Sequence, residues 1–243
     1  MLRKVDWFEE WFDSPYYHIL YKNRDQKEAD KFIHNLVNYL EVKVNSKILD
    51  LACGKGRHSL ILNQLGMHVN GVDLSKNSIN EAKKKQNTTL QFDTHDMREV
   101  FKTNKYNYVF NLFTSFGYFE NMNDNIKMLD SISKMLLEKG ILVIDFLNAE
   151  KVVKNLISIE EKKIDNITFK IKRYIESNKV YKKITIEDKT RHHFTERVQL
   201  FSLNEFKELL KPNFKILHTF GDFDLNRFDV KHSERLIIIA QLK

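Results

Sequence analysis

Apolar residues in the middle of the chain form five short runs. The runs fall at residues 47–51, 67–72, 89–92, 106–112 and 140–147. Continuous apolar runs of about four to eight residues are typical of strands that are covered on both faces of a sheet. Helices are predicted between them, at 57–65 and 122–137. Strands that alternate with helices in this way indicate an α/β fold with a parallel sheet.

The pattern changes at both ends of this central region. Apolar residues at helical spacing over 28–40 follow an aromatic-rich start, which predicts a helical cap. From 167 to 175 apolar and polar residues alternate, and 180–187 and 192–201 are further candidate strands, so we expect an antiparallel flap of two or three strands. The chain is thus divided into a helical cap (1–40), a core (41–158), a flap inserted after the fifth strand (159–201) and a completion of the core sheet (202–243).

Composition fits one enzyme-sized unit. The 243 residues suffice for one α/β domain with a sizeable core and an appendage. No apolar run approaches the roughly 18 residues expected of a membrane span, and Met1 to Glu10 lacks the apolar segment of a signal peptide. Because Cys53 is the single cysteine, we expect no internal disulfide and no multi-cysteine zinc site. The expected location is the reducing cytoplasm.

The chain is basic, with a formal net charge of +7 from 40 basic and 33 acidic residues. A nucleic-acid partner is one interpretation of such a balance. We favour a lysine-rich solvated surface, because arginine and aromatic residues are not interleaved along one stripe. Nucleic acid therefore stays an alternative partner.

The strongest chemical signal is the turn after the first predicted strand. Residues 48–56 read Ile-Leu-Asp-Leu-Ala-Cys-Gly-Lys-Gly, and the second strand ends in Gly-Val-Asp-Leu-Ser over 71–75. Glycines allow a tight turn and a close approach to a ligand. A carboxylate such as that of Asp73 suits the two hydroxyls of a ribose. The order of these segments predicts a nucleoside-containing cofactor across the carboxyl ends of two parallel strands.

The stretch Asp50-x-Ala52-x-Gly54-x-Gly56, with Asp73 after it, resembles the first two motifs of class I methyltransferases that depend on S-adenosylmethionine (SAM). The resemblance runs through residues 36–150, with a matching tail at 203–243. It implies a Rossmann-like, seven-stranded, mostly parallel sheet with helices on both faces, SAM as the cofactor and S-adenosylhomocysteine as the product.

The resemblance also implies roles for single residues around the first two strands. Asp50 is expected near the cofactor amine, usually through water, and Gly54 and Gly56 let the methionine part pass. Asp73 holds the ribose, and Leu74 packs on adenine. The loop residues Ala52 and Cys53 complete this set, and we interpret Cys53 as a small packing residue and not a nucleophile.

Further candidates follow the third and fourth strands and precede the core. Asp96 is expected to accept from the adenine amino group, with the backbone of Met97 beside a ring nitrogen. Leu112 and Phe113 occupy the place where the family covers the methionine end. In the cap, the expected cofactor contacts are Tyr17, Tyr21 and Arg24, with Arg24 pairing the cofactor carboxylate.

Methyl transfer from a sulfonium is a direct displacement, so alignment and desolvation do much of the work and no universal catalytic residue is expected. Tyr118 after the fourth strand and His193 in the flap are the candidate bases. No metal site is predicted, because His192 and His193 are adjacent on an alternating strand and point to opposite faces.

The sequence therefore predicts a SAM-dependent methyltransferase that acts on nitrogen or oxygen of a small molecule, as a monomer or a homodimer. The stretch after the fourth strand, Asn-Leu-Phe-Thr at 111–114, lacks the Asn/Asp-Pro-Pro-Tyr/Phe motif typical of amino-methylation in nucleic acid. The alternatives are an RNA- or protein-modifying methyltransferase and a non-catalytic SAM-binding regulatory protein.

Overall fold

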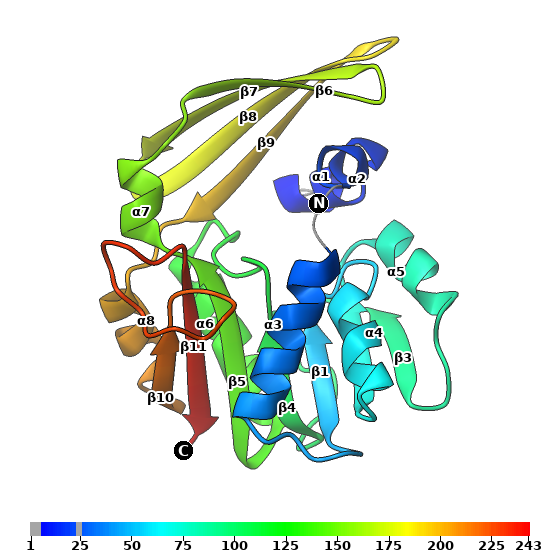
Figure 1. Ribbon diagram of the computed structural model, residues 1–243, viewed down its shortest axis with the longest axis vertical. Coiled ribbons are helices and arrows are strands. Elements are labelled where there is room, and N and C mark those ends of the chain that lie inside the picture. Colours follow the sequence, from blue (N-terminus) through cyan, green and yellow to red (C-terminus); the bar gives the residue numbers. More distant parts are fainter. Residues whose placement is uncertain (1–5, 23–25) are drawn as a thin grey trace, which may run out of the picture.

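The computed structural model describes residues 6–22 and 26–243, which form two sheets and the helices around them (Figure 1). The larger sheet has seven strands in the order β10-β11-β5-β4-β1-β2-β3. Its strands are β1 (Lys47–Leu51), β2 (His68–Asp73), β3 (Leu90–Thr94), β4 (Tyr106–Asn111), β5 (Leu136–Leu147), β10 (Phe214–Phe220) and β11 (Arg235–Leu242). Strands β1 to β5 are parallel, whereas β11 is antiparallel to both β5 and β10. The predicted Rossmann-like class is confirmed.

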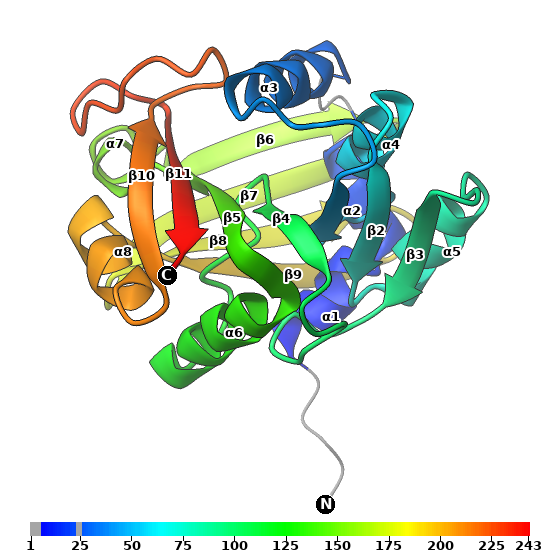
Figure 2. The ribbon, with the colours of Figure 1, turned by 90° about the horizontal axis from the view of Figure 1, so that it is seen from below.

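Helices cover both faces of this sheet. The helices are α1 (Trp7–Phe12), α2 (Pro15–Leu20), α3 (Gln26–Tyr39), α4 (Arg57–Gln64), α5 (Lys76–Lys83), α6 (Met122–Met135), α7 (Ala149–Lys154) and α8 (Leu203–Leu210). Helices α3 and α4 lie on one side of the sheet, with α6 and α8 on the other (Figure 2). Two apolar clusters form the core. Buried Phe32 and Ile61 from α3 and α4 belong to one cluster, and buried Met128 and Phe206 from α6 and α8 belong to the other. Burial on both faces explains why the strands are continuous apolar runs.

The flap is a separate four-stranded antiparallel sheet in the order β6-β7-β8-β9. Its strands are β6 (Ile159–Ile164), β7 (Ile167–Glu176), β8 (Lys179–Glu187) and β9 (Arg191–Gln199). The sequence predicted two or three strands and missed β6. This segment reads Ile-Glu-Glu-Lys-Lys-Ile and has no apolar alternation. It is an edge strand, and charged side chains there limit pairing with other chains.

The cap helices α1 and α2 lie under the flap, above the carboxyl ends of the core strands (Figure 1). The side chain of Trp11 is fully buried in a cluster with flap residues that include Phe169 and Ile184. The cap therefore covers the inner face of the flap. Within the described ranges, no helix is long and apolar enough to cross a membrane.

Candidate active site

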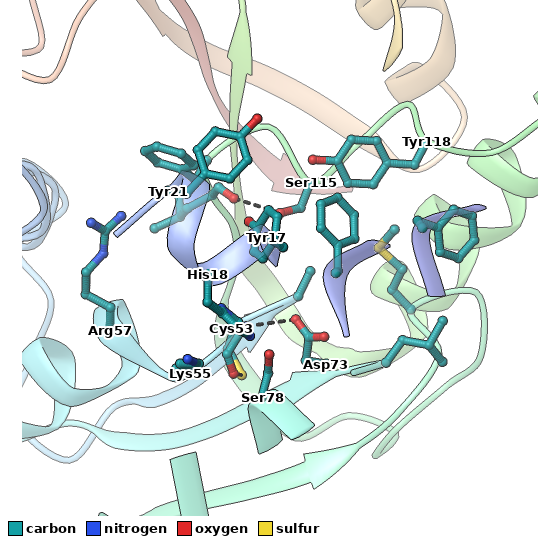
Figure 3. Close-up of a pocket in the computed structure, with 18 of the residues that line it drawn as sticks. Tyr17, His18, Tyr21, Cys53, Lys55, Arg57, Asp73, Ser78, Ser115 and Tyr118 are labelled. Carbon is teal, nitrogen blue, oxygen red and sulfur yellow. Dashed lines mark hydrogen bonds between the residues drawn. The ribbon is translucent and has the colours of Figure 1, made fainter. Parts of the chain in front are cut away.

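A cavity of about 540 Å³ opens where the core, the cap and the flap meet (Figure 3). It lies at the carboxyl ends of β1, β2 and β4, where ligands bind in open α/β sheets. Its volume is in the range of pockets for small molecules and cofactors. Residues from the core, the cap and the flap line it, and they include Tyr17, Tyr21, Ala52, Cys53, Gly54, Asp73, Leu74, Asp96, Met97, Leu112, Phe113, Tyr118 and Glu196.

The glycine loop between β1 and α4 has left-handed backbone at Ala52, Gly54 and Gly56, with φ of 63°, 55° and 74°. A Cβ added at Gly56 would lie 2.5 Å from the ring of Phe92, so this glycine is needed for packing. A Cβ added at Gly54 would meet nothing within 4 Å. Since Gly54 also lines the cavity, the backbone there leaves a cradle open to a ligand.

Asp73 ends β2 and faces the cavity from beside this loop. Its Oδ2 accepts from the Gly54 amide at 2.8 Å, and its Oδ1 accepts from the Ser75 amide at 2.8 Å. Burial raises the pKa of Asp73, while the backbone donors of Ser75, Gly54 and Leu74 oppose that rise. The carboxylate is thus fixed in place and keeps acceptor capacity for a diol.

Asp50 lies beneath the loop and not on the cavity wall. Only 1% of the residue is exposed, and its Oδ2 accepts from the Ser59 hydroxyl at 2.5 Å. Burial raises the pKa of Asp50 to about 6. The observed contact of Asp50 is with the first turn of α4, and its expected approach to the cofactor amine through water stays a prediction.

Cys53 is buried, and burial raises the pKa of its thiol well above the ordinary value. A neutral buried thiol is a poor nucleophile. This environment agrees with a packing role inside the loop.

Asp96, Met97 and Leu74 line the side of the cavity beyond Asp73. Both carboxylate oxygens of Asp96 accept from Arg98, with Oδ2 2.6 Å from Nη2 and Oδ1 3.0 Å from Nε. Arg98 also lies 5.0 Å above the ring of Phe119. Arg98 was not singled out from the sequence, and its fork fixes the orientation of Asp96.

The loop after β4 is held by a buried ion pair that the sequence did not reveal. Phe113 and Thr114 both have left-handed backbone, with φ of 64° and 58°. The Phe113 amide donates to Asp145 Oδ2 at 2.8 Å, and Arg235 Nη2 lies 2.7 Å from Asp145 Oδ1 and donates to the Thr114 hydroxyl at 2.9 Å. Burial raises the pKa of Asp145, and Arg235 opposes that rise. Such backbone persists only when its surroundings determine it.

Aromatic side chains of the cap and of the loop after β4 close the opposite side of the cavity. Tyr17, Tyr21 and Tyr118 lie together in Figure 3, across the pocket from Cys53 and Asp73. The rings of Tyr17 and Tyr21 have centroids 5.0 Å apart. Arg24, the expected partner of the cofactor carboxylate, lies outside the described residues.

The two predicted bases differ in position. Tyr118 lines the cavity, and its hydroxyl donates to the Thr114 carbonyl. His193 is exposed on β9 and hydrogen-bonds Thr185 at 3.1 Å. Because side chains alternate along a strand, the cavity side of β9 carries Glu196 instead. The position of His193 thus gives no support to its predicted role.

From the sequence, Glu196 was considered only beside His192 and His193, as part of a possible metal or general-base group, and was given no place in the cofactor or acceptor site. Its Oε1 accepts from Trp11 Nε1 at 2.6 Å and from the Tyr21 hydroxyl at 2.7 Å. Its Oε2 lies 3.3 Å from Lys182 Nζ, and each of these two side chains is 13% exposed. The sequence held a signal, because Glu196 shares the period of apolar Phe194 and Val198.

Comparison with known proteins matches this chain to a family and to a curated relative. The family model described as the methyltransferase domain matches residues 42–184. The putative methyltransferase YqeM of Bacillus subtilis (strain 168) is 33% identical over 109 residues, which span 44% of each chain. The match thus covers less than half of that relative.

Two solved structures share the fold at low identity. A SAM-dependent methyltransferase from Clostridium acetobutylicum superposes with a TM-score of 0.79 at 20% identity, over 93% of this chain and 96% of the other. The sugar N-methyltransferase KedS8 from Streptoalloteichus sp. has a TM-score of 0.70 at 17% identity, over 93% and 92%.

Proposed function

This chain belongs to the methyltransferase-domain family of class I SAM-dependent methyltransferases, and we propose that the whole protein transfers a methyl group from SAM to nitrogen or oxygen of a small molecule. The observation that carries the proposal is the open cradle at Gly54 beside the fixed carboxylate of Asp73. These two features lie on one cavity wall and fit the methionine and ribose parts of SAM.

The remaining contacts follow from the cavity lining. We assign Asp96 and the Met97 backbone to adenine, and Leu112 and Phe113 to the methionine end, because all four residues line the cavity. Bound SAM supplies an electrophilic methyl group on a sulfonium, whose carbon–sulfur bond breaks as the bond to the acceptor forms. The protein's part is to align the acceptor, exclude water and receive a proton.

A small acceptor is favoured by the position of the cap and flap. The acceptor side is walled by Tyr17, Tyr21 and Tyr118 from the cap and the β4 loop, and by Val198 from β9. A covered cavity of this size suits a small molecule better than an RNA or protein chain. The likeness to the sugar N-methyltransferase KedS8 supports the same class of acceptor.

The test is to incubate the protein with SAM carrying a labelled methyl group and with cell extract separated into small molecules, RNA and protein. We expect label in the small-molecule fraction, and no label without the protein. Label only in RNA or protein would replace this proposal with the corresponding modification, and no transfer to any fraction would contradict methyltransferase activity.

A further inference from the structure

We propose that the methyl acceptor is an amine and that Glu196 receives its ammonium group. This inference rests on the proposed methyl transfer and adds the class of acceptor and the residue that recognises it.

Three carboxylates line the cavity within the described part of the chain: Asp73, Asp96 and Glu196. Asp73 belongs to the wall at the end of β2 and is held by backbone amides. Asp96 is held by the fork of Arg98. Glu196 alone comes from the flap, which lies across from the carboxyl ends of the core strands (Figure 1). It is therefore the carboxylate on the acceptor side.

Three side chains hold Glu196 in one position. Trp11 donates to Oε1 at 2.6 Å, the Tyr21 hydroxyl is shared between Oε1 at 2.7 Å and Oε2 at 2.9 Å, and Lys182 forms an ion pair with Oε2 at 3.3 Å. Lys182 lies behind Glu196 on β8 and directly opposite it in the sheet register. The two side chains form an ion pair within the flap. An ionised carboxylate has about four acceptor positions, so a further donor from the cavity can be accommodated.

The rings beside Glu196 suit a cation as well. The Tyr17 ring lies 5.0 Å from that of Tyr21 and 4.9 Å from that of Phe12, measured between centroids. All three residues line the cavity. Aromatic faces attract an ammonium group, and an acceptor alcohol would gain no such attraction. A carboxylate within an aromatic wall thus discriminates an amine from an alcohol of the same shape.

Glu196 also has a role in the proton balance. A protonated amine cannot attack, so one N–H bond of the ammonium must break and its proton must pass to a base. Transfer to Glu196 breaks that N–H bond and forms one O–H bond, and this proton passes to water when the products leave. The freed nitrogen lone pair then forms the new bond to the methyl carbon.

The experiment is calorimetric titration of the full chain, saturated with S-adenosylhomocysteine, with benzylamine and with benzyl alcohol as the neutral isostere. We expect benzylamine to bind at least about tenfold more tightly, the effect of one charge-assisted hydrogen bond. Glu196→Gln should abolish this preference. Glu161→Gln, the same change at an exposed site on the flap edge, should leave it intact.

A double variant separates the loss of the carboxylate from any loss of folding. Glu196→Gln leaves Lys182 buried without its partner, so Glu196→Gln/Lys182→Met removes both charges and should give the same loss of preference. If Glu196 only joins the cap to the flap, the variants will alter stability or cofactor affinity and keep the preference for the amine. That result, or equal or absent binding of the two probes, overturns the inference. Failure of S-adenosylhomocysteine to bind overturns the proposed function itself.

Discussion

At the residue scale, the carboxylates around the glycine loop have separate tasks. Asp73 faces the cavity, whereas Asp50 is sealed beneath it. The sequence predicted that both acids would lie at the carboxyl ends of strands of one sheet, Asp50 within the first strand and Asp73 directly after the second. It did not distinguish their exposures, because exposure depends on how α4 packs over β1. The same limit applies to the flap, where the face of β9 that turns inward selects Glu196 over His193.

Asp73→Ala should weaken binding of S-adenosylhomocysteine, because it removes charge-assisted hydrogen bonds to the ribose of roughly 1.5–3 kcal/mol each at most. Calorimetric titration measures the loss. Asp73→Asn is the matched variant, since it removes the charge, keeps one acceptor oxygen and replaces the other oxygen, which also accepts from a backbone amide, with an NH2 donor. Unchanged affinity in both variants would place the ribose elsewhere.

Asp50 should make stability depend on pH. Its pKa is about 6 in the folded protein against an ordinary value of 3.8, so the folded state binds more protons between these values. The stability from this group is fully present below pH 3.8 and is lost as pH rises through about 6, by about 3 kcal/mol in total. The free energy of unfolding of Asp50→Asn, measured in urea, should therefore rise relative to that of the wild type as the pH is raised from acid to neutral. An equal difference in unfolding free energy between the two proteins at acid and at neutral pH would contradict this.

At the element scale, the site depends on segments that are far apart in the sequence. The loop after β4 is braced by Asp145 from β5 and Arg235 from β11. The cap is tied to α5, because the Asp13 carboxylate accepts from the Ser75 hydroxyl at 2.6 Å and from the Asn77 amide at 3.0 Å. Neither set of contacts could be predicted from the sequence, because each joins residues that are far apart in the chain and share no local pattern.

Arg235→Met should destabilise the protein by about 3–5 kcal/mol, because it leaves the fully buried carboxylate of Asp145 without its partner. Urea unfolding measures the loss. The double variant Asp145→Asn/Arg235→Met should recover much of it, because no charge then stays buried. A double variant no more stable than the single one would show that the charge pair is not the source of the loss.

At the scale of the whole molecule, the core was predictable and the flap only in part. Strands β1, β2 and β4 are apolar runs followed by turn residues, so their order and the glycine loop could be predicted from the sequence. Strand β6 could not, because an edge strand exposed to water needs no apolar pattern. The cavity itself arises only when the cap, the core and the flap meet.

The most direct test of the account is calorimetric titration of the protein with S-adenosylhomocysteine, with NAD as the control. The cavity at the ends of β1 and β2 predicts binding of S-adenosylhomocysteine at about micromolar affinity, near −8 kcal/mol, and none of NAD. Absent binding of S-adenosylhomocysteine, or a preference for NAD, would contradict the methyltransferase account and leave the Rossmann-like fold without this cofactor.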